Sequence, residues 1–119
     1  MTIPPIRTAI QWTVLTALFV ALGYAASAGM VPKSPPVTVS QKGQMFSISV
    51  LDVSSGETVR IVNDETVLPH HAYVDSETFR FDSGDQAPGS TTDITFPVSG
   101  TFTVLCGIHP KMKLTVYVK

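Results

Sequence analysis

The fold is decided by the segment Cys106-Gly107-Ile108-His109-Pro110-Lys111-Met112, which has the pattern C-x-x-H-x-x-M. A run of alternating residues, 100–105, leads into this segment, and a second run, 113–118, leads out of it. Alternation with a period of two is typical of strands that bury one face. The segment is therefore predicted to be a short loop between two strands, at one end of a sheet.

The loop brings together three different donor groups, a thiol, an imidazole and a thioether, from Cys106, His109 and Met112. Two more imidazoles lie upstream, at His70 and His71. Two imidazoles, a thiolate and a weak thioether are the ligand set of a blue-copper electron-transfer site. Adjacent strand residues point to opposite sides of a sheet, so one of the two upstream histidines is expected to reach the metal. The residues alone leave open which one.

Cys106 is the only cysteine of the chain, so it cannot form an internal disulfide. An idle thiol in an exported protein would be prone to oxidation, and metal ligation is a good reason to keep one. Phe102 and Val104 have the same strand parity as Cys106, which predicts that the thiol points inward with the core. Taken singly, the three loop residues would be ordinary core or surface side chains. Their joint spacing favours a metal site.

The N-terminal residues 1–28 have the features of a secretory signal. Arg7 is followed by an apolar stretch, residues 10–22, and by the small-residue triplet 26–28, which predicts cleavage near residue 28. An uncleaved anchor helix is the alternative, because no charge lies between Arg7 and Lys33. In both cases the folded part is expected to be periplasmic or otherwise exported, with membrane contact only if the segment is retained.

The rest of the chain reads as a linker, 29–36, and one all-β domain, 37–119. Removal of residues 1–28 takes away one basic side chain, so seven Lys and Arg remain against nine Asp and Glu, a formal charge of −2. This mild charge excludes nucleic acid and an anionic membrane surface as expected partners. About seven to eight short strands are expected, which is typical of a small β-sandwich.

The predicted strands cover 37–39, 45–50, 58–63, 71–74, 79–81, 91–96, 100–106 and 113–118, with loops at 83–85 and 87–90. The predicted core consists of the in-phase apolar residues Phe46, Ile48, Val50, Val53, Val59, Ile61, Phe81, Ile94, Phe96, Phe102, Val104, Leu114 and Val116.

Three stretches resemble the plastocyanin/amicyanin group of cupredoxins: 46–64, 69–71 and 100–112. The C-x-x-H-P-x-M loop is similar to the short loop of amicyanin. The resemblance covers nearly all of residues 37–119 and implies a Greek-key β-sandwich with a type 1 copper ion. Carried over by position, it implies the ligands His70, Cys106, His109 and axial Met112. His71 stands where the family usually has an asparagine that ties the two ligand-bearing loops together.

The resemblance implies a carrier of single electrons that is not an enzyme. A monomer is expected, with a redox partner protein of the cytochrome or dehydrogenase type. In the family, a redox partner docks where the imidazole of the C-terminal loop meets an apolar surface patch. Here that residue would be His109, with Leu68, Pro69, Ile108 and Pro110 around it.

Copper delivery, with His71 assisting metal transfer, is the alternative function. An enzyme with several copper centres is disfavoured because the chain has three histidines in all. A structural zinc site is disfavoured because zinc rarely takes a methionine ligand.

Overall fold

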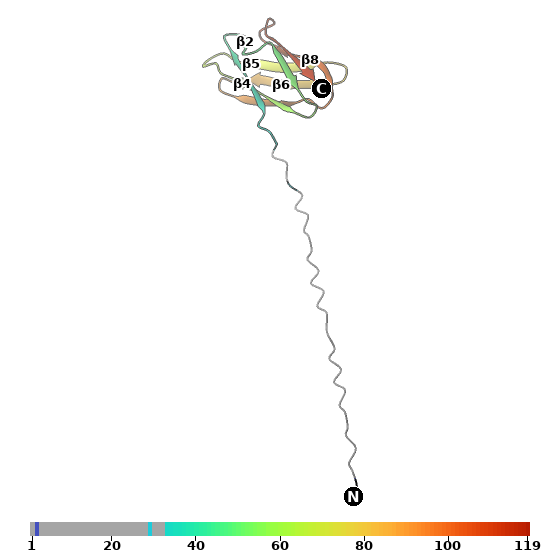
Figure 1. Cartoon of the computed structure of the whole chain (residues 1–119). Coiled ribbons are helices and arrows are strands. Elements are labelled where there is room, and N and C mark those ends of the chain that lie inside the picture. The colour runs from blue at the N-terminus through green and yellow to red at the C-terminus, as the bar shows by residue number, and fades with distance from the viewer. Residues whose placement is uncertain (1, 3–28, 30–32) are drawn as a thin grey trace. The chain divides into compact units, whose positions relative to one another are not determined.

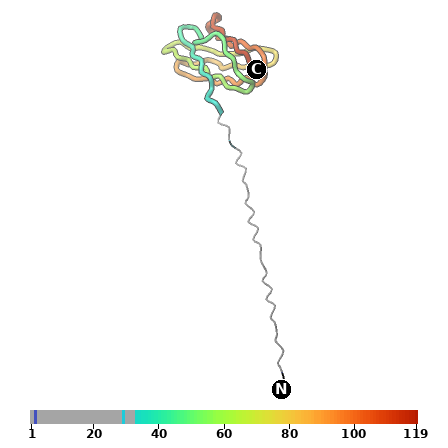
Figure 2. Tube along the Cα trace, in the orientation of Figure 1, coloured from blue at the N-terminus to red at the C-terminus, as the bar shows by residue number. Residues whose placement is uncertain are grey.

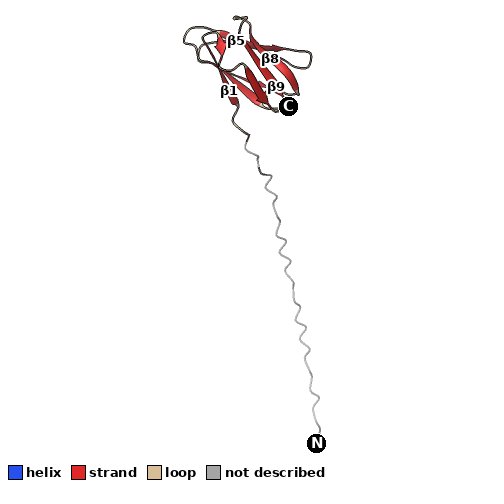
Figure 3. Cartoon of the chain, turned by 45° about the horizontal axis from the view of Figure 1, so that its top comes forward, coloured by secondary structure: helices blue, strands red, loops and turns tan. Residues whose placement is uncertain are grey.

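The computed structural model describes Thr2, Gly29 and residues 33–119. The predicted signal or anchor helix, apart from Thr2, and residues 30–32 of the predicted linker lie outside the described residues. No helix among the described residues has the length and apolar character needed to cross a membrane. In residues 33–119 the regular structure consists of strands joined by loops and turns (Figure 3).

The described residues form nine strands in two sheets packed as a sandwich (Figure 1). Their bounds are β1 Val37–Lys42, β2 Met45–Phe46, β3 Val50–Val53, β4 Thr58–Asn63, β5 His70–Asp75, β6 Arg80–Gln86, β7 Thr91–Thr95, β8 Gly100–Cys106 and β9 Lys113–Val118. One sheet has the order β2-β1-β4-β7 and the other β3-β9-β8-β5-β6. The pairs β1–β4 and β3–β9 are parallel, and all other pairs are antiparallel. The predicted all-β sandwich is confirmed.

The strand count differs from the prediction because residues 45–50 are not one strand. The Ser47 amide still donates to Ser40 O of β1, whereas Ser49 O already accepts from the Thr115 amide of β9. The chain therefore crosses from one sheet to the other over three residues. This crossing breaks the inward alternation, so the core prediction is wrong for Ile48, which is 38% exposed, and for Val50, which is 51% exposed.

The remaining predicted core lies between the sheets, and Phe81 is partly buried against it. The buried apolar residues are Val39, Phe46, Val53, Val59, Ile61, Ala72, Val74, Ile94, Phe96, Phe102, Val104, Cys106, Met112, Leu114, Val116 and Val118. Phe79, Phe96 and Phe102 form an aromatic cluster with ring centroids 5.4 to 5.7 Å apart. Aromatic contacts of this kind add about 0.5 to 1.5 kcal/mol each beyond the area they bury.

Residues 83–85 do not form the predicted loop but continue β6 to its end at Gln86. Gly84 has a φ of 63°, a left-handed conformation that glycine adopts without steric cost. The pairing of β5 with β6 shifts register between His71 and Tyr73, opposite this glycine. The turn signals in the sequence therefore mark an irregularity inside a strand pair.

The Cα trace brings the start of β5 and the end of β8, which are far apart in the sequence, to one end of the sandwich (Figure 2). β5 lies beside β8 in the five-stranded sheet, with Ala72 paired to Cys106. β8 and β9 form a hairpin whose connection is the C-terminal loop, residues 107–112. The start of β5 and the end of β8 are therefore neighbours, which places both halves of the candidate site within reach of one another.

Candidate metal centre

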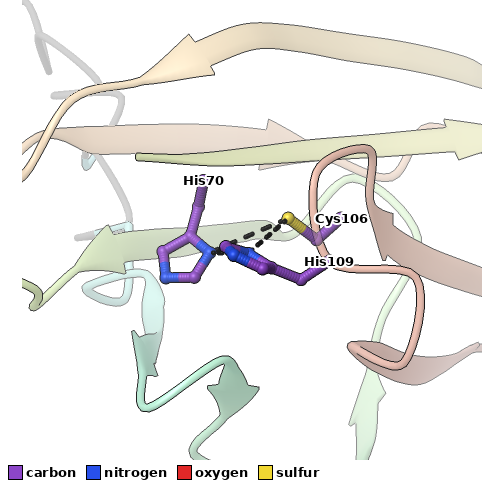
Figure 4. A group of neighbouring side chains, drawn as sticks. All are labelled: His70, Cys106 and His109. Atoms are coloured by element: carbon purple, nitrogen blue, oxygen red, sulfur yellow. Dashed lines mark hydrogen bonds between the residues drawn. The ribbon is translucent and has the colours of Figure 1, made fainter. Parts of the chain in front are cut away.

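Three donor atoms from the two segments converge at the end of the sandwich (Figure 4). The Nδ1 atoms of His70 and His109 lie 3.1 Å apart. The Cys106 Sγ lies 3.7 Å from each of these nitrogens. Among the described residues, these are the ones whose donor atoms meet at distances suited to a single ion.

Each donor is positioned by its place in the sheet. Cys106 is the last residue of β8 and is 2% exposed, so its thiol points inward, as the parity of Phe102 and Val104 predicts. His70 is the first residue of β5 and is fully buried. His109 comes from the C-terminal loop and is partly exposed. The site is thus closed on two sides and meets solvent at one imidazole.

The donor separations fit a metal ion. An ion about 2.0 to 2.1 Å from each nitrogen and about 2.3 Å from the sulfur holds such donors about 3 to 4 Å apart at trigonal or tetrahedral angles. The observed separations of 3.1 and 3.7 Å lie in this range. Two neutral imidazoles with both Nδ1 atoms unprotonated would instead repel at 3.1 Å, because both atoms are then acceptors. The three residues therefore have the geometry to bind one copper ion.

Met112 is buried and belongs to the same core cluster as Cys106. Its backbone amide donates to His109 O at 3.0 Å, which closes a turn inside the C-terminal loop. The turn fixes the position of Met112 relative to His109. The role of Met112 as an axial ligand stays a prediction.

Glu65 orients the imidazole of His70, and sequence reasoning missed it. Its Oε1 lies 3.4 Å from His70 Nε2 and accepts from the Gly43 amide at 2.6 Å. A carboxylate on Nε2 holds the proton there and leaves the Nδ1 lone pair facing the thiol. The signal available in the sequence was a carboxylate five residues before a ligand histidine.

The ionisation of this pair follows from its surroundings. Burial lowers the pKa of His70, and the neighbouring His109 lowers it further, although Glu65 raises it. Burial raises the pKa of Glu65, but the hydrogen bonds from Gly43, His70 and Gln44 together outweigh it, so this pKa lies below its ordinary value. A neutral His70 beside an ionised Glu65 is the state that can present Nδ1 to a metal.

A buried polar network supports the upstream loop, residues 64–69. The Asn63 side chain donates to Leu68 O at 3.0 Å and to Gln86 O at 2.9 Å, and its Oδ1 accepts from the Glu65 amide at 3.0 Å. The side-chain Nε2 of Gln41 donates to Gln86 Oε1 at 2.9 Å. Because Gln86 is also the cross-strand partner of His70, this network fixes the backbone of His70.

His71 does not join the three donors. Its Nε2 bonds to Asp82 Oδ1 at 2.6 Å, and its ring lies 5.8 Å from that of Tyr73. Its backbone oxygen accepts from the Gly107 amide at 3.0 Å. The alternation of side chains along β5 thus turns His70 into the sandwich, beside Cys106 and His109, and turns His71 onto its outer face.

Apolar side chains are exposed in both segments that carry the imidazoles. Leu68 is 39% exposed and Ile108 is 41% exposed, and Pro69 and Pro110 are exposed as well. Leu68 and Pro69 precede His70 directly, and Ile108 and Pro110 flank the partly exposed His109. Both imidazole-bearing segments therefore present apolar side chains to solvent.

No protein-family model matches the sequence. No curated protein sequence matches it. Among solved structures, the copper-containing nitrite reductase NirK from Thermus scotoductus SA-01 matches with a TM-score of 0.66 and 32% identity over 71% of this chain. The match spans 22% of that enzyme's chain.

Variants of amicyanin match over most of their length. An oxidised variant is 21% identical, with a TM-score of 0.65, over 72% of this chain and 84% of its own. A Cu(I) variant is 22% identical, with a TM-score of 0.65, over 71% of this chain and 82% of its own. The described domain therefore has the cupredoxin fold, and His70, Cys106 and His109 have the donors for a type 1 copper ion.

Proposed function

We propose that this domain is a type 1 copper protein that carries single electrons between redox partners. The observation that carries the proposal is the convergence of two imidazole nitrogens and one thiol within 4.8 Å of one another at a buried end of a cupredoxin fold. Copper would supply the exchange between Cu(I) and Cu(II), for which thiolate, imidazole and thioether are a compromise ligand set. We propose His70, Cys106, His109 and axial Met112 as these ligands.

The chain's own part in the transfer is to hold the donors still. Cys106 ends a central strand, and Asn63 and Glu65 fix the backbone and the ring of His70. Donors that move little between two oxidation states keep the reorganisation small. No additional donor on the chain is needed for this task, which favours a carrier over an enzyme that must leave a position open for a substrate.

The partner is proposed to be a redox protein that docks over His109. This residue is the partly exposed one of the three donors, and the exposed Leu68 and Ile108 give the surrounding surface its apolar character. The near-neutral charge of the domain suits an apolar contact better than strong electrostatic steering. A partner centred here would come close to the buried thiol through a single imidazole.

Export is proposed from the sequence pattern of residues 1–28, with the linker at 29–36 and the folded domain at 37–119. An exported setting would also explain a single cysteine that is kept as a ligand. A copper-containing nitrite reductase is among the similar structures, but the histidines of this chain are too few for further copper centres.

The test is a titration of the copper-free domain with Cu(II), followed by optical spectra. An intense blue thiolate-to-copper band is expected for the natural sequence, and Cys106→Ser should abolish it. His71→Ala is the matched control, because it removes an imidazole outside the donor set and should leave a charge-transfer band in place. A colourless complex that does not change oxidation state would refute the carrier.

Copper delivery, the alternative function, predicts a different exchange behaviour. A carrier should keep its ion through repeated cycles of reduction and oxidation in the presence of a copper-free acceptor protein. A delivery protein should lose the ion on mixing. Copper content after ten such cycles, measured on the repurified domain, separates the two.

A further inference from the structure

On the outer face of the five-stranded sheet, the ring of His71 lies between Asp82 and Gly107. One edge of the ring bonds to Asp82 through Nε2, at 2.6 Å. The other edge lies against Gly107, the first residue after Cys106. A Cβ built on Gly107 would come within 2.7 Å of His71 Nδ1 and within 3.2 Å of two ring carbons. The contact at 2.7 Å is shorter than real Cβ atoms make, and the two at 3.2 Å are tighter than most, so the ring can lie this close only because Gly107 has no side chain.

Gly107 is thus held by His71 in two ways. The backbone oxygen of His71 accepts from the Gly107 amide at 3.0 Å. The imidazole covers the space next to its Cα. Because Gly107 follows the thiol residue directly, a shift of this glycine would move Cys106 relative to His70.

Asp82 fixes the position of the ring. Its Oδ1 accepts from His71 Nε2 and also from the Gly84 amide at 2.8 Å. The left-handed Gly84 turns its amide toward the preceding carboxylate, at the register shift between β5 and β6. The carboxylate is therefore held on two sides although its side chain is exposed, and the His71 ring cannot rotate freely.

We propose that His71 and Asp82 act as a positioning pair, which presses the imidazole onto Gly107 and thereby fixes the Cys106 end of the C-terminal loop. The relation of this pair to copper rests on the proposed function. The pair acts from outside the donor set: Nε2 is engaged by Asp82 and Nδ1 faces Gly107. It would link the two ligand-bearing segments by packing of the His71 ring, which is held by its hydrogen bond to Asp82.

The first experiment uses the copper-free domain and measures hydrogen exchange of the Gly107 amide by NMR. Asp82→Ala and His71→Ala should each speed this exchange by about 10-fold relative to the Val104 amide in the core. Asp85→Ala is the matched control, because Asp85 is the cross-strand neighbour of His71 and is exposed. It removes the same charge from the same strand and should leave the Gly107 amide unchanged.

Asp82→Asn should restore most of the protection, because an amide oxygen still accepts from Nε2, and it also serves if the alanine variants fold poorly. Equal exchange at Gly107 in all variants would overturn the proposal. So would an increase that is matched at Val104, because that would be a general loss of stability.

The second experiment uses the Cu(II)-loaded domain. Asp82→Ala should change the relative intensities of the thiolate-to-copper bands and release copper about 10-fold faster, whereas Asp82→Asn should stay close to the natural sequence. An unchanged spectrum and release rate in Asp82→Ala would overturn the proposal. A natural domain without any blue band would refute the proposed function instead, and the exchange of Gly107 would still decide whether the pair holds the loop.

A double-mutant cycle gives the sharpest form of the test. Gly107→Ala should slow copper uptake strongly in the natural background, because the new Cβ displaces the His71 ring. In a His71→Ala background the same change should have a much smaller effect, because the space is then free. Equal effects in the two backgrounds would overturn the contact.

Discussion

The upstream loop, residues 64–69, and the C-terminal loop, residues 107–112, meet at the same site but are held by different means. The C-terminal loop joins two neighbouring antiparallel strands, β8 and β9, whose ladder already fixes its ends. The upstream loop joins strands of different sheets, β4 and β5, so no shared ladder holds it. Buried side chains hold it instead, above all Asn63.

Because of this difference, the upstream loop should matter mainly for folding stability and the C-terminal loop mainly for metal binding. The C-terminal loop contains two of the four proposed ligands, His109 and Met112, and directly follows a third, Cys106, at the end of β8. Its backbone needs little help from polar side chains. The upstream loop leads directly into one proposed ligand, His70, the first residue of β5, and depends on polar groups outside the proposed ligand set. Substitutions in the two loops should therefore have opposite profiles, with loss of folding for the upstream loop and altered metal properties for the C-terminal loop.

The largest effect is expected for Asn63→Ala. The change leaves Leu68 O, Gln86 O and the Glu65 amide without their partner. Buried groups left unsatisfied cost about 1 to 3 kcal/mol each, so a loss of about 3 kcal/mol or more in the free energy of unfolding is expected. Urea denaturation of the copper-free domain measures it. Asp64→Ala, an exposed neighbour, is the control, and an equal loss there would contradict the assigned role of Asn63.

An intermediate effect is expected for pH. The pKa of His70 is lowered in the folded domain, mainly by burial, so protonation favours the unfolded chain. The copper-free domain should hold its full stability above the ordinary histidine pKa of about 6.5 and lose stability as the pH falls below it. Glu65, whose pKa is also lowered, should add a further loss at lower pH, below the ordinary carboxylate range. Thermal unfolding from about pH 8 down to about pH 2.5 measures both losses.

The histidine part of this loss has its own control. His70→Gln removes the buried imidazole, so the variant should lose less stability than the natural domain as the pH falls from the histidine range to the carboxylate range. If the stability of the natural domain increased as the pH fell from about 6.5 to about 5, this would contradict the burial of a neutral His70.

The smallest effect on folding is expected for Met112→Leu. The two side chains have similar volumes, so the free energy of unfolding should change by less than about 1.5 kcal/mol. The copper ion should stay bound and its reduction potential should rise, because a weak donor to Cu(II) is lost. Voltammetry of the loaded domain measures the shift. A potential equal to that of the natural sequence would remove Met112 from the ligand set and weaken the contrast between the loops.

Sequence reasoning was successful where a local pattern carries the information. The parity of β8 predicted the inward thiol, and the spacing of Cys106 and His109 predicted donor groups that lie together at the end of a sandwich. The ligand role of Met112 stays a prediction. The resemblance chose His70 over His71, and the alternation along β5 agrees with that choice. The inward thiol follows from periodicity over a few residues, whereas the choice of His70 needed the resemblance.

The features that were missed depend on contacts between distant segments. The crossing at residues 47–49 keeps the same alternation as a continuous strand, so nothing local marks it. Glu65 and Asn63 act through a fold that places β1, β5 and β6 around the upstream loop. The contact of His71 with Gly107 requires knowledge of which strands are neighbours.

The crowding of Cys106, His109 and Met112 into seven residues has a thermodynamic consequence. An unfolded chain still carries these three groups close together and can hold a metal ion with them. Binding to the unfolded chain reduces the stabilisation that a ligand gives to the native state. The rise in melting temperature on loading copper should therefore report mainly what His70 and the native geometry add, and it should fall short of the value calculated from the affinity of the folded domain alone.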